Sequence, residues 1–181
     1  MIYHLSLRAA GFIAGVMLTL LSALAFSSAA RTSLPRFPRS RIAGAVLLTI
    51  DLIWSLWLLA TMEMGEFSNF RRPLLIILPV GYFLVLKFVD EFLAVRALGI
   101  LCLLAAEPLL DAAFLRPEMS RLLVTIFAYL MIVVGLLWVT MPYLLRDQIS
   151  WGTRSTGVWR VVAGIALVFG LAIVTCAAMA Y

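Results

Sequence analysis

The residues best placed for chemistry are four charged side chains inside otherwise apolar stretches, Asp51, Arg96, Glu107 and Asp111. An ionisable group within a membrane span is costly, so each is a functional candidate whose partner must be identified. On a helix with about 3.6 residues per turn, Arg96, Glu107 and Asp111 fall within roughly 60° of one another and share a face. These charges define the candidate site, and no residue is predicted to be catalytic.

Asp51 and Arg96 are predicted to form an ion pair between two helices. They lie about nine and four residues into their spans, so at about 1.5 Å per residue their depths differ by only about 7–8 Å. A long arginine side chain can reach across that difference. Three roles remain open for the pair: a static contact that fixes the helices, part of an ion or proton pathway, or contact with a partner protein.

Glu107 lies about 16 Å from Arg96 along the helix axis, so its expected partners are other arginines: Arg71, Arg72, Arg116 or Arg121. Pro108 leaves two interpretations open. Because the residue before a proline avoids the helical region, the span can end near Ala106, with a short interfacial helix after it. If the helix is instead continuous, Glu107 keeps a strong claim on function.

Several other chemistries lack the residues they need. His4 is the single histidine, whereas bis-histidine haem, the facial iron triad and HExxH zinc sites each need more than one. Neither a G-x-S-x-G elbow nor a glycine-rich phosphate loop occurs. Cys102 and Cys176 lie deep in apolar runs, where free cysteine behaves as a small hydrophobe. We therefore expect no metal site, cofactor or catalytic centre, and interpret His4 as an interfacial polar residue.

The composition is that of a membrane protein. Hydrophobic residues make up 65% of the chain and charged residues 13%, against roughly 45–50% and 25% in ordinary globular chains. The net charge of +5 comes almost wholly from arginines between apolar runs. The positive-inside rule expects them there, whereas nucleic-acid binding would gather them on one folded face. We predict an all-α integral membrane protein in contact with the lipid bilayer and without a nucleic-acid partner.

Six apolar runs must position the charges, each near the roughly 20 residues that cross a bilayer. They lie near residues 9–30, 42–62, 74–89, 92–115, 122–145 and 158–180, in one predicted transmembrane domain over residues 1–181. The third run carries Pro79, which a membrane helix tolerates with a kink. Residues 34–41 are predicted to form an extended basic loop and residues 151–157 a polar turn. Acidic residues at the ends of runs, such as Glu63 and Glu66, are expected to be solvated or interfacial.

The basic residues predict the orientation. Nine lie in or beside the loops after the first, third and fifth spans, and five lie on the other side. The side with nine is predicted to be cytoplasmic, which places both termini outside. A cleaved signal peptide is the alternative for residues 9–30, but the following arginines resist export: Arg31, Arg36, Arg39 and Arg41.

Short connections leave no room for a soluble domain, so any site must be built from helix faces and short loops. Gly11 and Gly15 have the small-xxx-small spacing that permits close helix packing, within the chain or with a partner subunit. The first expectation for function is a non-catalytic accessory or structural subunit of a larger membrane complex. The alternative is a small ion or solute transporter or channel that uses Asp51, Arg96 and Glu107. An intramembrane enzyme acting on lipid is least favoured, because no nucleophile and base are paired.

Overall fold

The computed structural model describes residues 3, 5–89, 91–119 and 121–179, so His4 lies outside the described residues. Within that part the chain forms helices and no strand. They are α1 (Leu7–Ala25), α2 (Ser28–Ser33), η1 (Leu34–Arg39), α3 (Arg41–Thr61), η2 (Gly65–Phe70), α4 (Arg71–Phe88), α5 (Leu93–Ala113), α6 (Arg121–Thr140), α7 (Tyr143–Thr153) and α8 (Thr156–Met179). Six described segments are long and apolar enough to cross a bilayer: α1, α3, η2 with α4, α5, α6 and α8. The predicted all-α class is confirmed, and the chain is a multi-pass integral membrane protein.

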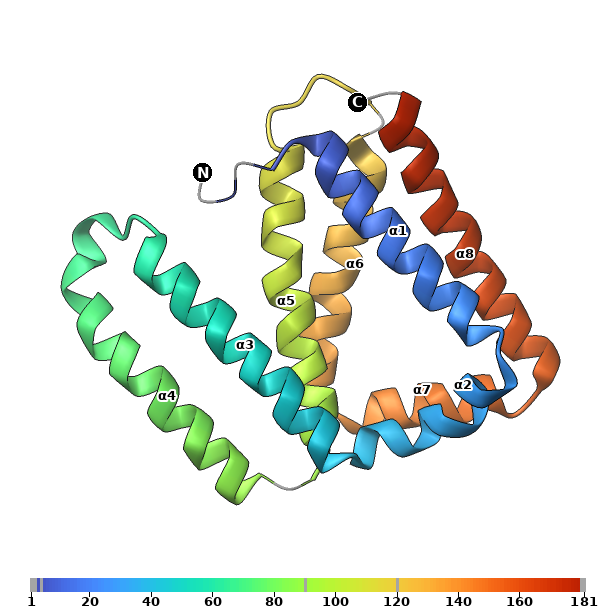
Figure 1. The fold of residues 1–181 in the computed structure, drawn as a ribbon, viewed down its shortest axis with the longest axis horizontal. Helices are drawn as coiled ribbons and strands as arrows, with labels where there is room; N and C mark the ends of the chain where they lie inside the picture. The colour runs from blue at the N-terminus through green and yellow to red at the C-terminus, as the bar shows by residue number, and fades with distance from the viewer. Residues whose placement is uncertain (1–2, 4, 90, 120, 180–181) are drawn as a thin grey trace.

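Two antiparallel helix pairs, α1 with α8 and α5 with α6, form the centre of the fold (Figure 1). Glycines let their backbones approach closely. A β-carbon on Gly15 would lie 3.0 Å from the Gly170 carbonyl oxygen of α8. One on Gly99 or Gly135 would lie 2.8 Å from the other glycine's carbonyl oxygen. Gly15 therefore lies at a contact inside the chain, and Gly11 is also buried.

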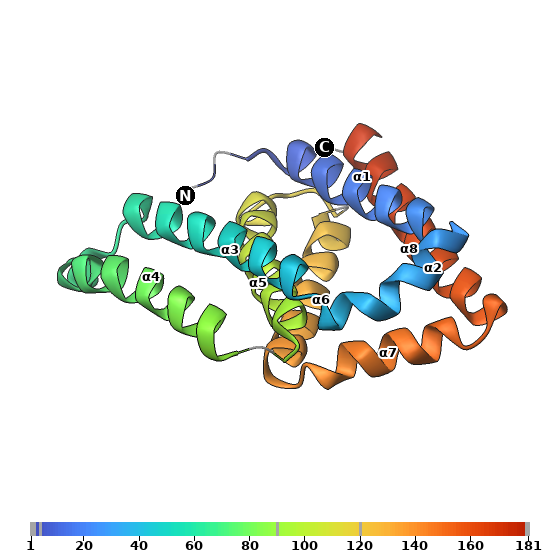
Figure 2. The ribbon, with the colours of Figure 1, turned by 60° about the horizontal axis from the view of Figure 1, so that its bottom comes forward.

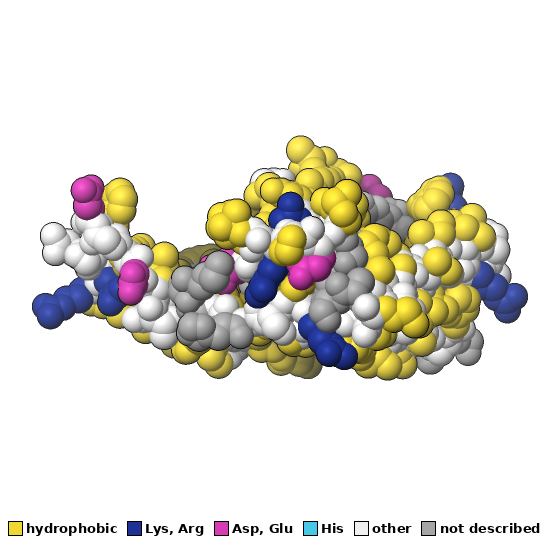
Figure 3. All heavy atoms as spheres, turned by 90° about the horizontal axis from the view of Figure 1, so that it is seen from above, with side chains coloured by type: hydrophobic (Ala, Val, Ile, Leu, Met, Phe, Trp, Pro, Cys, Tyr) yellow, Lys and Arg dark blue, Asp and Glu magenta, His cyan; other side chains and the backbone are white. Residues whose placement is uncertain are grey.

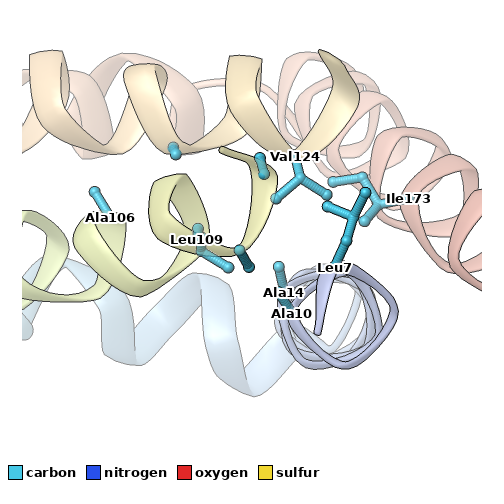
Figure 4. Close-up of a cluster of buried hydrophobic side chains, with 10 residues drawn as sticks. Leu7, Ala10, Ala14, Ala106, Leu109, Val124 and Ile173 are labelled. Carbon is cyan, nitrogen blue, oxygen red and sulfur yellow. The ribbon is translucent and has the colours of Figure 1, made fainter. Parts of the chain in front are cut away.

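The main hydrophobic core joins these two pairs. Figure 4 shows side chains of α1, α5, α6 and α8 pointing toward one another, and it labels Leu7, Ala10, Ala14, Ala106, Leu109, Val124 and Ile173. Ala10, Val124 and Ile173 are fully buried. Six of the ten described residues in this core are alanine, so the helices meet through short side chains and backbone more than through interlocked large side chains.

The hairpin of α3 and α4 leans away from the four central helices (Figure 1). A β-carbon on Gly44 of α3 would lie 2.7 Å from the Ala94 nitrogen of α5, so the two helices are in close contact there. The helix α4 packs on α3, where the hydroxyls of Thr49 and Tyr82 are 2.8 Å apart. None of the 18 residues of α4, all of which the structure describes, is buried.

Three short helices, α2, η1 and α7, lie across one end of the molecule (Figures 1 and 2). The predicted extended loop at 34–41 is wrong, because residues 34–39 form the 3-10 helix η1 with Pro35 in its first turn and Pro38 buried. The predicted helices at 9–30 and 122–145 are too long. Ser27 caps a separate helix by accepting a 3.2 Å hydrogen bond from the Ala30 nitrogen, and Pro142 lies between α6 and α7 because proline resists helix continuation.

Helix α7 also shortens the predicted polar turn at 151–157. It runs to Thr153 and α8 begins at Thr156, so only residues 154 and 155 connect them. Val95 of α5 packs with Leu145 and Ile149 of α7 in a second apolar cluster beneath the central helices. The short helices therefore close this end of the bundle by apolar contact.

Candidate functional site

The charged end of α5 belongs to a continuous helix. Helix α5 runs from Leu93 to Ala113 with Pro108 inside it, so the alternative of a separate interfacial helix after Ala106 is wrong. Proline removes one backbone donor, and a membrane helix can absorb that loss through neighbouring groups. Glu107 and Asp111 are therefore residues of a membrane span.

Both carboxylates line a cleft of about 1060 Å³ between α3, α5 and α6. Glu107 and Asp111 are four residues apart and so face the same side of α5. Glu63, just after the end of α3, supplies a third carboxylate to the lining. The rest of the lining combines aromatic, hydroxyl and aliphatic side chains, among them Trp57, Thr61 and Ile132. Two elements thus bring three acidic side chains to one cleft, although Arg96 does not line it.

Tyr3 lies beside this cleft. Its ring centroid is 5.5 Å from that of Trp57, and its hydroxyl oxygen accepts a 2.7 Å hydrogen bond from Nε1 of Trp54. Burial raises the pKa of Tyr3 above its ordinary value, the bond from Trp54 lowers this pKa, and the charge of Glu107 raises it. The N-terminal segment therefore brings an aromatic hydroxyl within electrostatic reach of Glu107.

The cleft lies toward the end of the molecule where α1 begins and α8 ends. Figure 3 looks down on that end and shows acidic and basic side chains among extensive apolar surface, with the projecting hairpin set apart from the main body. Glu107 is exposed to the cleft, although it is the fifteenth of 21 residues in α5. A carboxylate at such a position is costly against hydrocarbon. The cleft is therefore suited to a polar or cationic occupant.

Glu107 has no ion pair with its expected partners. Within the described residues, none joins it to Arg71, Arg72, Arg116 or Arg121. Arg71 instead donates a hydrogen bond from Nη2 to the carbonyl oxygen of Met62. The carboxylates of the cleft are thus not neutralised by arginines from neighbouring loops.

Asp51 is the second candidate feature. Its exposed fraction is 3%, and neither carboxylate oxygen has a hydrogen-bond partner in the described part of the chain. The predicted pair with Arg96 is not formed, and Nε of Arg96 is likewise buried and unpartnered among the described residues. Helix α5 packs on α3 through Leu93, Ala94 and Ala97. The centre of this contact face lies roughly 100° around the helix axis from Arg96. Asp51 and Arg96 therefore do not meet, although they lie at similar depths in the membrane.

From the sequence, Glu63 was expected to be solvated or interfacial, and Trp54 and Trp57 were expected only to anchor or pack their helix; Tyr3 was not singled out. Only the crossing of α3 and α5 places Glu63 near Glu107, and no spacing in the sequence encodes that crossing. Within the described residues, no group of three or more His, Cys, Asp or Glu side chains could hold a metal ion. The cleft is therefore an acidic and aromatic surface.

The function of the cleft and of Asp51 must be inferred from the residues that form them, because no related protein gives a guide. Comparison of the chain with protein-family models, with curated proteins and with solved structures found no match.

Proposed function

We propose that this protein is a non-catalytic subunit of a larger membrane complex and that a cationic segment of a partner protein occupies the cleft between α3 and α5. The observation that carries the proposal is Glu107, a carboxylate exposed within a membrane span and lacking an ion pair among the described residues. A partner lysine or arginine would remove the unfavourable exposure of this charge to lipid.

The hairpin supports this proposal. The helix α4 has no buried residue in its fully described length, and the hairpin contacts the main body chiefly where α3 meets α5. The opposite part of α3 stands apart from α5 and leaves room for the cleft. A transmembrane helix of a partner could fill that space and pack against both α3 and α5.

The test is purification from native membranes in a mild detergent, followed by mass measurement of the intact assembly. We expect a stoichiometric membrane partner, which the double substitution Glu107→Gln and Asp111→Asn releases. Glu66→Gln in the exposed helix η2 is the matched control and leaves the assembly intact. Recovery of the wild-type chain alone, with an unchanged mass for all variants, contradicts the proposal.

Photo-crosslinking locates the partner. A photoreactive residue at Leu110, which lines the cleft, should form a protein adduct. The same residue at Val133, an exposed position of α6, should react only with lipid. Equal protein adducts at both positions would show that the cleft has no special role.

A second candidate, a small cation transporter, is favoured by Asp51. A buried carboxyl without a partner in the described residues is a plausible binding point for a proton or a cation below the cleft. Purified protein in liposomes would then accumulate cations, and Asp51→Asn would abolish the uptake, whereas Asp147→Asn at an exposed position would not. Absence of uptake by the wild-type protein rejects this candidate.

For the orientation, we propose that the end with α2, η1 and α7 faces the cytoplasm. It gathers basic residues, among them Arg31, Arg36, Arg39 and Arg154, as the positive-inside rule predicts. Single cysteines introduced at Arg39 and Arg116 on a cysteine-free background should differ in labelling by an impermeant reagent in intact cells. Labelling at position 116 alone agrees with this orientation, and labelling at position 39 alone reverses it.

A further inference from the structure

A second pocket lies at the opposite end of the molecule, between the end of α1, α2 and the start of α8. Its volume is about 460 Å³. Two arginines, Arg31 and Arg160, line it together with the hydroxyl residues Ser27, Thr153 and Thr156. No acidic residue occurs among the described residues of its lining. Because α1 ends and α8 begins here, the pocket lies at the level expected for lipid headgroups.

Arg31 is held in a fixed orientation. Nε and Nη2 donate to the carbonyl oxygen of Thr153 at 3.2 and 2.7 Å, and Nη1 donates to Oγ1 of Thr156 at 2.6 Å. A guanidinium carries five N–H groups, so further donors remain for an anion after these bonds. Arg160 has an exposed side chain on the first turns of α8. A fixed guanidinium beside an adaptable one is well suited to bind a phosphate.

Trp159 also lines this pocket. Its Nε1 donates a 2.6 Å hydrogen bond to the carbonyl oxygen of Ala25, which ties the start of α8 to the end of α1. Tryptophan is favoured at the membrane interface because its ring is apolar and its N–H is polar. The bond therefore makes the pocket a preformed feature at this boundary.

An apolar groove of about 540 Å³ follows on α8 and includes Val161, Gly164, Val168 and Ala172. A β-carbon on Gly164 would have no described heavy atom within 4 Å, so the floor of the groove is open there. Arg160 is one turn before Gly164 and about 40° from it around the helix. Arg160 lines the basic pocket, and the groove begins at the next residue of the chain, Val161.

We propose that the basic pocket binds the phosphate of an anionic phospholipid headgroup and that an acyl chain of this lipid lies in the groove on α8. Charge complementarity supports the headgroup, and the position of Arg160 beside Gly164 supports the chain. Basic pockets between membrane helices on the cytoplasmic side bind such headgroups. Free inorganic phosphate has the same charged group as the lipid headgroup, but it has no acyl chain to bind in the groove.

The test measures lipid binding by the full chain after delipidation in detergent. Phosphatidylglycerol should bind more tightly than phosphatidylcholine, and Arg160→Gln should weaken phosphatidylglycerol binding about tenfold, the effect of one lost charge-assisted hydrogen bond. Arg160→Lys should recover part of the affinity. Arg154→Gln, which removes a charge at the same end but outside the pocket, is the matched control and should change the affinity less than about twofold.

A second set of measurements tests whether an acyl chain occupies the groove on α8. Gly164→Leu should weaken phosphatidylglycerol binding without lowering the thermal stability of the lipid-free protein, because the added side chain meets open space. Inorganic phosphate at millimolar concentration should not displace the lipid. Equal binding by wild type and Arg160→Gln overturns the headgroup site. Full displacement by inorganic phosphate, or unchanged lipid binding by Gly164→Leu, overturns the lipid assignment in favour of a free anion.

Discussion

The four central helices and the α3–α4 hairpin use glycine in opposite ways. Gly99 and Gly135 bring the backbones of α5 and α6 into direct contact. Gly81 of α4 would place a β-carbon with no described heavy atom within 4 Å. Both regions have the apolar composition of membrane spans, so composition alone does not distinguish a packed helix from one that is open to lipid or to a partner. The distinction depends on where backbone can touch backbone.

The strongest test of this comparison is Gly135→Val. Its β-carbon would lie 2.8 Å from the Gly99 carbonyl oxygen, so α5 and α6 must separate, with an expected loss of about 3 kcal/mol in the free energy of unfolding. The matched control Gly81→Val should change it by less than about 0.5 kcal/mol. Thermal unfolding in detergent, followed by circular dichroism, measures both. Equal losses would mean that α4 is packed in solution.

A substitution of Asp51 tests the contact between the hairpin and the four central helices, because α3 is the hairpin helix that packs on α5. Asp51→Leu should raise the free energy of unfolding by about 1–2 kcal/mol, because it removes a buried polar group that has no partner among the described residues. The control Asp147→Asn breaks an exposed ion pair, 2.9 Å from Arg146, and should cost less than about 1 kcal/mol. Denaturant titration of both variants gives the comparison. Marked destabilisation by Asp51→Leu would reveal a partner for this carboxyl.

Removing one hydrogen bond from each region is a smaller perturbation that also compares them. Trp159→Phe removes the bond between α8 and α1 and should lower the free energy of unfolding by about 1 kcal/mol. Tyr82→Phe removes the bond between α4 and α3 and should affect global unfolding less, because α4 packs chiefly on α3 and has no buried residue. Chemical unfolding without added lipid measures both variants. A larger loss for Tyr82→Phe would reverse the assignment of core and periphery.

The smallest expected effect concerns Tyr3. Its raised pKa means that its contribution to stability is complete below the ordinary value of about 10 and is lost as pH rises through the raised value. Glu107→Gln should lower the pKa of Tyr3, since the charge of Glu107 raises it, whereas Glu66→Gln should not. The difference in near-ultraviolet absorbance between each protein and its Tyr3→Phe derivative follows this titration. An unchanged pKa in Glu107→Gln would remove Tyr3 from the surroundings of the cleft.

The sequence was sufficient to predict six spans, because span length and hydropathy are local properties. It also marked Glu107 and Asp111, whose four-residue spacing survives in the continuous helix α5. It could not predict the cleft, since Glu63 and Glu107 line the same cleft only because α3 packs against α5. The Asp51–Arg96 pair failed for the same reason: depth follows from residue number, whereas the direction of a side chain depends on which helix faces are in contact. The short helices α2 and α7 each begin inside a predicted run and continue beyond its end, so the sequence pattern did not separate them from the span.

The short helices at the closed end make the two sides of the protein unequal. The cleft is lined by residues toward one end, including Thr61 and Asp111, while Val95, Leu145 and Ile149 seal the other by apolar contact. A solute in the cleft would therefore meet this apolar contact before it reached the other end. Any passage of a solute from the cleft to the closed end would require α7 to move away from α5.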